Sequence, residues 1–209
     1  MEQSTLKYLR IVVPGLIILV GIYPIYDFYF PETFRIDSIE FSYLISLSIV
    51  AGSIYYQLNF QRLLTYPSHY LIRKNIFQKL VKISTLQLSE NKKEKLWKKD
   101  RFMHVFYKII DNDESLKRKG ANVYFNGIFW TSTADSFLIN LCFYAVYKLF
   151  YFDLPKAAEL ATLLGLLSFL SLALHIISVI KHIKLSNDQL DYIKTHNSLD
   201  VKNKLNEIL

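Results

Sequence analysis

Cysteine, glycine and proline are scarce in this sequence: of 209 residues, one is cysteine, six are glycine and five are proline. The single Cys142 excludes a disulfide framework and any cysteine-rich zinc or iron–sulfur site within one chain. The sequence also contains no glycine-rich phosphate loop and lacks the aromatic spacing of an RNA-reading sheet. The sequence therefore lacks the motifs that would indicate a function most directly.

Charged residues are also scarce, and they are unevenly distributed. They make up 21% of the chain and apolar residues 52%, whereas an average globular protein has about 25% and 45–50%. Residues 41–61 and 160–180 carry no formal charge. As helices, at about 1.5 Å per residue, each would be about 31 Å long, which matches a hydrocarbon core of about 30 Å. We therefore expect both stretches to cross a bilayer.

Two further stretches are interpreted as membrane spans. Residues 11–30 are mainly apolar, and membrane helices tolerate prolines such as Pro14 and Pro24 near their ends. A secretory signal peptide is the alternative, but no small-residue cleavage site follows. In the other stretch, the capping-box pattern of Ser132 and Asp135 predicts a helix over 133–152. The expected fold class is thus an all-α polytopic membrane protein with four spans.

The positions of lysine and arginine predict the orientation. Of these 25 residues, 22 lie before residue 11, within 58–119 or after residue 180, and cytoplasmic flanks carry such an excess. We therefore expect both termini in the cytoplasm and residues 28–40 and 153–158 outside. An aromatic belt is expected at the outer boundary, comprising Tyr23, Tyr26, Phe28, Tyr29, Phe30, Tyr147, Phe150, Tyr151 and Phe152.

These patterns divide the chain into four segments. Residues 1–57 hold the first two spans, and residues 58–132 form a basic cytoplasmic insert. Residues 133–182 hold the last two spans, and residues 183–209 form a cytoplasmic C-terminal part.

The insert is too long for a turn and too apolar for a disordered linker, so we expect it to be folded. Its helical periodicity predicts helices near 58–66, 69–84 and 90–110. An irregular return to the membrane is expected through residues 123–130. After the fourth span, polar caps at 186–188 and Ser198 predict two short helices.

Residues 58–119 carry fifteen basic and six acidic residues, a net charge of +9. One interpretation is attraction to anionic lipid, worth about 1 kcal/mol per basic residue near the surface. The other is a site for an acidic protein, nucleic acid or nucleotide, although no motif supports the last two. The lysines expected to contact lipid or a partner are Lys92, Lys93, Lys98 and Lys99.

Polar residues recur at steps of three and four positions in the fourth span: Ser168, Ser171, His175, Ser178 and His182. At 100° per residue of a helix, they fall within an arc of about 80°. The second span has a similar stripe, which comprises Ser42, Ser46, Ser53 and Gln57. Such stripes either line a pore or allow two helices to pack closely, and the sequence leaves both interpretations open.

Asp135 in the third span and His175 in the fourth are expected at similar depth in the membrane. Ionisable residues there are costly and often functional. We predict that the two form a carboxylate–imidazole pair, which would be a latch between helices or, if water reaches it, a proton-sensitive gate. Elsewhere no Ser/His/Asp, Cys/His or paired-carboxylate pattern supports hydrolysis. We therefore expect no enzymatic activity, cofactor or metal.

Arg62 and His69 have an Arg-x6-His spacing that resembles the signature of HEPN ribonucleases. The resemblance implies a basic residue and a histidine that act on RNA phosphates. It covers eight residues; Leu63 replaces the polar residue usual after the arginine, and Pro67 is expected to interrupt the helix. The alternative is that both are surface residues beside the membrane.

The layout of four spans around a basic insert resembles that of small membrane components of prokaryotic antiviral systems, such as the membrane subunit of the Kiwa defence pair and membrane accessories of RNA-targeting CRISPR loci. The resemblance covers the whole chain but includes no specific motif, so no functional residue is carried over. It implies an oligomer in the inner membrane of a prokaryote that anchors a cytosolic partner or perturbs the membrane on infection.

Three functions follow from these observations. The polar stripes favour an oligomeric pore or membrane-perturbing effector that is controlled through the cytoplasmic insert, and this is the first choice from the sequence. The folded basic insert and the lack of catalytic motifs favour a membrane scaffold or sensor. A membrane-embedded enzyme has the least support. The expected partners are the lipid bilayer, further copies of the chain and a cytosolic protein that binds the insert.

Overall fold

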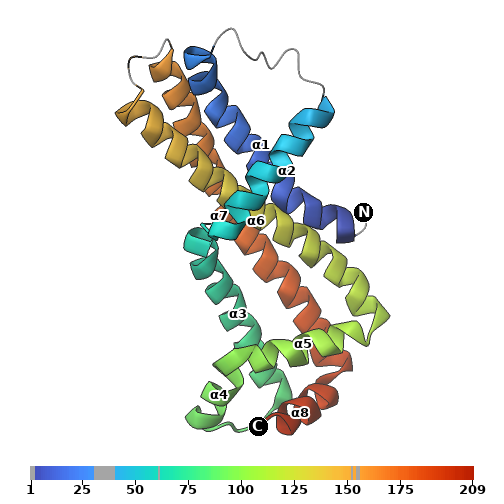
Figure 1. Ribbon diagram of the computed structural model, residues 1–209. Helices are drawn as coiled ribbons and strands as arrows, with labels where there is room; N and C mark the ends of the chain where they lie inside the picture. The colour runs from blue at the N-terminus through green and yellow to red at the C-terminus, as the bar shows by residue number, and fades with distance from the viewer. Residues whose placement is uncertain (1–2, 31–40, 61, 152, 154–155) are drawn as a thin grey trace. The chain divides into compact units, whose positions relative to one another are not determined.

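The computed structural model describes residues 3–30, 41–60, 62–151, 153 and 156–209, without the side chains of residues 3–7 and Lys99. Of the expected outer loop of residues 28–40, residues 31–40 lie outside the described residues. Every element in the described ranges is helical, as the sequence predicts (Figure 1). The elements are α1 (Gln3–Tyr29), α2 (Phe41–Leu58), α3 (Arg62–Ser84), α4 (Glu90–Trp97), the 3₁₀ helix η2 (Lys98–Asp100), α5 (Arg101–Asp111), α6 (Glu114–Leu149), α7 (Ala157–His196) and α8 (Ser198–Glu207).

The chain forms two compact units. The first comprises residues 1–65 and 128–178, and the second comprises residues 66–127 and 179–209. Helices α6 and α7, with 36 and 40 residues, each contribute to both units.

Three of the described helices are long and apolar enough to cross a membrane, and they indicate a membrane protein. They are Tyr8–Tyr29 within α1, Phe41–Leu58 and Ala157–His196. Helix α6 is not among them, because its apolar part is interrupted by polar residues such as Asp135 and Lys148.

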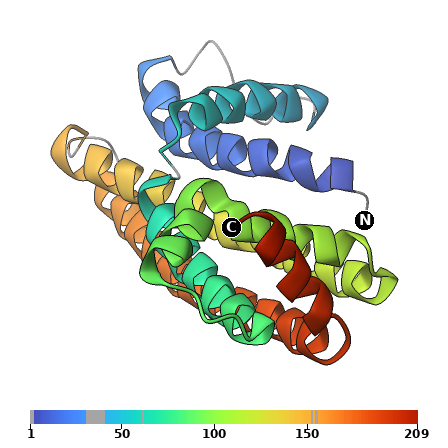
Figure 2. The same ribbon diagram turned by 90° about the horizontal axis from the view of Figure 1, so that it is seen from below.

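In the first unit, α1 and α2 cross with their backbones in contact (Figures 1 and 2). A Cβ atom on Gly15 would lie 1.8 Å from the carbonyl oxygen of Ser48, and one on Gly52 would lie 1.9 Å from that of Ile11. Only glycine allows this approach at either point. The Ser48 hydroxyl is fully buried at the crossing and donates to the carbonyl of Leu44 at 2.6 Å. Small residues are the usual means by which membrane helices pack closely.

Helices α1, α6 and α7 meet around Tyr147, which the sequence places in the outer aromatic belt. The structure instead buries its side chain in an apolar cluster with Ala157, Ala161 and Leu164. Its hydroxyl donates to the carbonyl oxygen of Gly21 at 2.8 Å. The buried hydroxyl is thereby satisfied, and Tyr147 joins three helices of the first unit.

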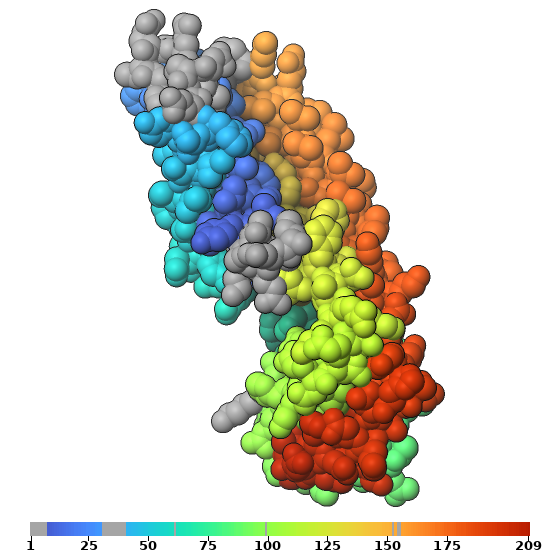
Figure 3. Space-filling model, turned by 90° about the vertical axis from the view of Figure 1, so that its right-hand side faces the viewer, coloured from blue at the N-terminus to red at the C-terminus, as the bar shows by residue number. Residues whose placement is uncertain are grey.

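The second unit has an apolar core of its own. Helices α5 and α8 pack together within it, and Figure 3 shows the red C-terminal residues against the green residues of α5. Each buried leucine, isoleucine or phenylalanine of such a core contributes about 1.5–3 kcal/mol. The side chains with no exposed surface are Leu80, Leu96, Phe102, Ile109, Leu116, Leu190, Ile193, Val201 and Leu205.

The predicted helix boundaries in this part of the chain are partly wrong. The separate helices expected at 58–66 and 69–84 are one helix, α3, which continues through Pro67. Pro67 lies in the second turn of α3, where the missing N–H removes one helical hydrogen bond.

The single helix expected at 90–110 is divided into α4, η2 and α5. The break occurs at Asp100, whose φ of 56° is left-handed, a conformation that aspartate tolerates better than most residues. Asp100 forms an ion pair with Arg73 of α3, whose guanidinium lies 4.8 Å from the centre of the Trp97 ring. Trp97 in turn stacks on Phe102, with the ring centres 5.3 Å apart. The ion pair and the stacked rings position the chain around Asp100, between α4 and α5, against α3.

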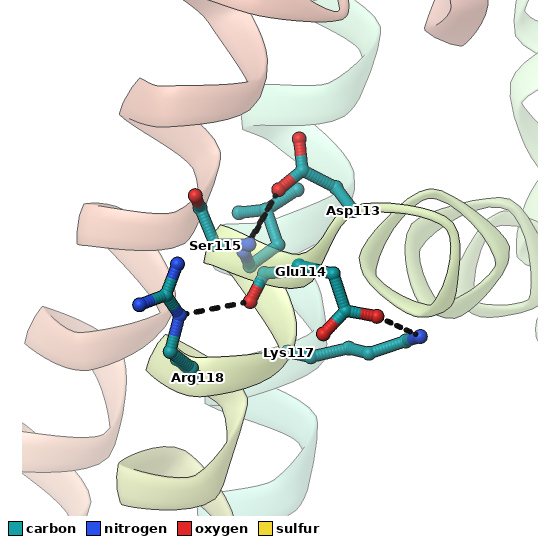
Figure 4. Close-up of polar contacts among 6 residues, drawn as sticks. Asp113, Glu114, Ser115, Lys117 and Arg118 are labelled. Atoms are coloured by element: carbon teal, nitrogen blue, oxygen red, sulfur yellow. Dashed lines mark hydrogen bonds and ion pairs between the residues drawn. The ribbon is translucent and has the colours of Figure 1, made fainter.

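Helix α6 begins at Glu114 rather than near residue 133. Oδ1 of Asp113 accepts hydrogen bonds from the backbone N–H groups of Ser115, at 2.8 Å, and Leu116, at 3.0 Å (Figure 4). Asp113 therefore caps the helix, and the return to the membrane through residues 123–130 is helical, not irregular. Ser132 lies inside α6, so the capping-box prediction at Ser132 and Asp135 is wrong.

The first turn of α6 also carries an ion pair. Nζ of Lys117 donates to the Glu114 carboxylate at 2.8 Å, and Nε of Arg118 donates to the Glu114 carbonyl at 3.4 Å (Figure 4). The hydrogen bond and the charge of Lys117 lower the pKa of Glu114. The carboxylate therefore stays ionised at neutral pH beside the positive end of the helix dipole, where negative charge is favourable.

Of the two short helices expected after the fourth span, only the second, α8, is present. Helix α7 continues through residues 186–188 to His196. Ser186 is buried in the second unit, and Asn187 accepts a hydrogen bond from Asn75 of α3 at 2.8 Å. Tertiary contacts therefore occupy the residues that resemble a cap.

Because Asp113 caps α6, Asp113→Ala should lower the free energy of unfolding by about 1 kcal/mol, the usual cost of losing an N-cap side chain. Ser132→Ala is the matched control and should change it by less than about 0.5 kcal/mol. Denaturant unfolding of the purified protein in mild detergent, followed by circular dichroism, measures both values. A larger loss at Ser132 than at Asp113 would contradict the observed start of α6.

Candidate functional site

The polar stripe of α7 forms hydrogen bonds with α6 inside the first unit. Oγ of Ser168 donates to the carbonyl of Phe137 at 3.2 Å, and Oγ of Ser171 lies 2.9 Å from Oγ of Ser136. Nδ1 of His175 lies 3.1 Å from the carbonyl oxygen of Trp130. We call this set the α6–α7 seam; it comprises Trp130, Ser136, Phe137, Ser168, Ser171 and His175.

The side chains that α7 contributes to the seam are buried. Ser168 is 3% exposed, Ser171 8% and His175 4%. Ser178, at 1%, donates to the carbonyl of His175 at 2.8 Å. Within one chain, therefore, α6 covers this part of the stripe. It serves helix packing, which is one of the two interpretations that the sequence leaves open.

His182, the last residue of the stripe, belongs to the second unit. Its Nδ1 lies 3.4 Å from Nδ2 of Asn126 on α6. A Cβ atom on Gly127 would lie 3.7 Å from Cε1 of the same ring, so the absence of a side chain there leaves the imidazole room. His182 thus links α6 and α7 in the second unit.

The stripe on α2 has a different environment. Ser46 and Gln57 are exposed, and Ser53 is half-buried. The Ser46 hydroxyl donates to the carbonyl of Ser42 one turn earlier, at 2.9 Å. Unlike the α7 stripe, this stripe lies mainly on the outer face of its helix.

Asp135 is buried, with 5% of its surface exposed, and it connects three helices of the first unit. Its Oδ1 accepts a hydrogen bond from the hydroxyl of Tyr55 on α2 at 3.1 Å. The guanidinium of Arg10 on α1 acts electrostatically on the same carboxylate. A buried carboxylate needs such partners, because burial without them is strongly unfavourable.

The predicted pair of Asp135 and His175 does not form. Asp135 bonds Tyr55, and His175 bonds the Trp130 carbonyl. The reason is the direction of the side chains: successive residues on a helix point about 100° apart. Since Ser136 faces α7, its neighbour Asp135 faces α2.

Sequence reasoning missed Tyr55 and Arg10. Ser48, Gly52 and Tyr55 are the buried residues of α2, and they recur at steps of four and three. The Ser48-x3-Gly52 spacing therefore marks the face of α2 that packs against other helices, and Tyr55 lies on that face. For Arg10, no local pattern distinguishes an arginine that acts on a buried carboxylate from an ordinary basic residue beside a membrane span.

Two of the four lysines expected to contact lipid or a partner form ion pairs within α4 and η2. Nζ of Lys93 lies 2.7 Å from the Glu90 carboxylate, and Nζ of Lys98 lies 2.9 Å from that of Glu94. Lys98 lowers the pKa of Glu94, so this acid remains charged. Lys92 is exposed. The side chain of Lys99 lies outside the described residues. The pairing of Lys93 and Lys98 with glutamates reduces the positive charge of this lysine cluster.

Arg62 and His69 lie on α3, which is continuous between them despite Pro67. Arg62 is exposed. Partial burial and the Arg73 guanidinium lower the pKa of His69 below its usual value, so the ring is neutral at pH 7. These observations do not assign a reaction to Arg62 or His69.

Comparison with known proteins gives no family: no family model, curated protein or solved structure matches this chain. Across the part of the chain that the structure describes, no three His, Cys, Asp or Glu side chains gather where they could hold a metal ion. The candidate site is therefore defined by its geometry alone. It comprises the α6–α7 seam, the hydrogen bond of Tyr55 to Asp135 and the charge of Arg10 that acts on the Asp135 carboxylate.

The contact between Tyr55 and Asp135 predicts a stability effect. Tyr55→Phe leaves a buried carboxylate without its donor and should lower the free energy of unfolding by about 1–3 kcal/mol. Tyr56→Phe is the matched control, because Tyr56 is 50% exposed. Denaturant unfolding in mild detergent measures both variants.

A double-mutant cycle with Asp135→Asn isolates the pair. The Tyr55→Phe/Asp135→Asn protein should lose less stability than the sum of the two single losses, since both singles remove the same contact. Equal losses for Tyr55→Phe and Tyr56→Phe, with additive effects in the cycle, would show that the contact contributes nothing.

Proposed function

We propose that this chain is a membrane scaffold that holds a folded basic unit at the cytoplasmic face of a membrane, where the unit binds a cytosolic protein. The observation that carries the proposal is the burial of the α7 stripe against α6. Polar groups that bond each other inside the chain join helices, which favours packing over a water-filled path along that face. The first unit is then an anchor.

The second unit is suited to the binding role. It has its own apolar core, and its surface carries exposed lysines on several helices. Positive surface charge speeds association with acidic partners and increases its dependence on salt. The layout resemblance to antiviral membrane components, which implies anchoring of a cytosolic partner in a prokaryotic inner membrane, supports the same proposal.

The proposal includes α6 as a fourth span. Its apolar part, residues 133–149, would be about 26 Å long, which is near the lower limit for crossing a bilayer. Asp135 bonds Tyr55 within the chain, and Lys148 is exposed near the end of the helix, where its ammonium reaches the interface. Four spans leave both termini and the second unit on the cytoplasmic side.

Cysteine labelling separates four spans from three. In a Cys142→Ala background, Asp153→Cys should react with an impermeant thiol reagent in intact cells, whereas Lys202→Cys should react only after lysis. If α6 does not cross the membrane, the pattern reverses, because α7 then carries the C-terminal part outside. Detergent-lysed cells provide the control that both cysteines are reactive.

A pore is the second candidate, and the exposed α2 stripe is the observation that favours it. Several copies of the chain could line a channel with Ser46 and its neighbours on α2, while the α6–α7 seam stays packed. The residue to test for conduction is therefore Ser46 rather than Ser171.

Leucine substitutions distinguish the two functions. Ser171→Leu should lower the free energy of unfolding by about 1–3 kcal/mol, because it adds bulk to a buried seam. Ser46→Leu should have little effect on stability. For a scaffold, planar-bilayer recordings of the purified protein show no current from either variant or from the parent chain. Current from the parent chain that Ser46→Leu abolishes, with an unchanged size-exclusion profile, would establish the pore instead.

A further inference from the structure

We propose that the second unit carries a collar that lies in the lipid headgroup layer and binds anionic phospholipid. The collar comprises Tyr66 and Tyr70 of α3, Phe125 of α6, and Ile180, Lys181 and Lys184 of α7. The proposal rests on the proposed function, because it requires a membrane anchor in the same chain.

The first support is the exposure of large apolar and aromatic side chains. Tyr66 is 72% exposed, Phe125 58% and Ile180 63%, and Tyr70 is 45% exposed. Such side chains on a water-facing surface usually mark an interaction site. Tyrosine is the residue type that is enriched where a membrane meets water, because its ring is apolar and its hydroxyl is polar.

The second support is that α3, α6 and α7 come close to one another at the same height in the second unit. His182 of α7 lies beside Asn126 and Gly127 of α6, and His69 of α3 acts electrostatically on its ring. The collar residues lie within about one helical turn of these contacts along each helix. The exposed aromatic residues of α3 and α6 therefore share a level with the start of the basic stretch of α7.

The third support is the change of polarity along α7. Exposed isoleucine at 180 gives way to exposed lysines at 181 and 184. Lys74 adds a further ammonium on α3, 6.0 Å from the centre of the Tyr70 ring. Apolar side chains followed directly by lysines match the boundary between acyl chains and phosphate groups, and anionic lipids supply the opposite charge.

The chemistry of this collar differs from that of the lysines on α4 and η2. Lys93 and Lys98 pair with glutamates of α4, whereas Lys181 and Lys184 stand beside exposed apolar residues. Two features are thus combined at the collar: aromatic rings that enter the headgroup layer and ammonium groups that meet its phosphates.

The test titrates phosphatidylglycerol, an anionic lipid, into the full-length chain in mild detergent and follows the midpoint of thermal unfolding. Phosphatidylcholine is the neutral comparison. A lipid that binds the folded state raises the midpoint in a concentration-dependent manner. We expect phosphatidylglycerol to act at lower concentration than phosphatidylcholine.

Lys181→Gln/Lys184→Gln should raise the half-saturating concentration of phosphatidylglycerol about 25-fold, since each lysine near a lipid surface contributes about fivefold in affinity. Lys194→Gln/Lys202→Gln is the matched control: it removes the same charge from two exposed lysines of the second unit that lie outside the collar, and it should change this concentration by less than twofold. Tyr66→Ser/Phe125→Ser should weaken the binding of both lipids.

The proposal is overturned if the two lipids act alike, or if the control pair weakens phosphatidylglycerol binding as much as the collar pair does. Because the titration is done in detergent, its result does not depend on the number of spans or on conduction. A negative lipid titration would therefore overturn the collar alone, whereas the scaffold is tested separately by cysteine labelling and planar-bilayer recordings.

Discussion

A polar side chain buried among apolar helices needs a hydrogen-bond partner within the protein, because neither acyl chains nor apolar side chains offer one. In the first unit, Ser168, Ser171 and His175 meet this requirement through the seam with α6. Each contact requires a particular rotation and register of the two helices. The direction of Asp135 toward Tyr55 follows, since it precedes Ser136 on the same helix.

The other helix contacts of the first unit also depend on close packing and on a buried hydrogen bond. The Gly15–Gly52 crossing brings the α1 and α2 backbones together, and the Tyr147 hydroxyl joins α6 to α1. The polar groups of the α6–α7 seam and Asp135 are thereby directed inward, while apolar side chains such as Ile54 and Phe169 remain exposed. An apolar outer surface over an internally bonded core suits a lipid-embedded anchor and supports the scaffold over a pore lined by α7.

Several features of the fold could be predicted because they depend on residues close in sequence. Helix α2, Phe41–Leu58, lies within the uncharged stretch 41–61, and residues 160–180 lie within α7. Helix ends were less predictable. Ser132 and Asp135 resemble a capping box, but the same spacing occurs inside helices. The side chain that caps α6 is Asp113.

The sequence by itself determined that the chain is helical, where its apolar helices lie and which residues share a helix face, because each of these properties follows from local composition and the 3.6-residue period. Only the tertiary structure decided the partners of the polar side chains. His175 bonds the carbonyl of Trp130 and Asp135 bonds Tyr55, 80 positions away. Such pairings depend on how two helices rotate against each other, and that rotation is set by many distant contacts together.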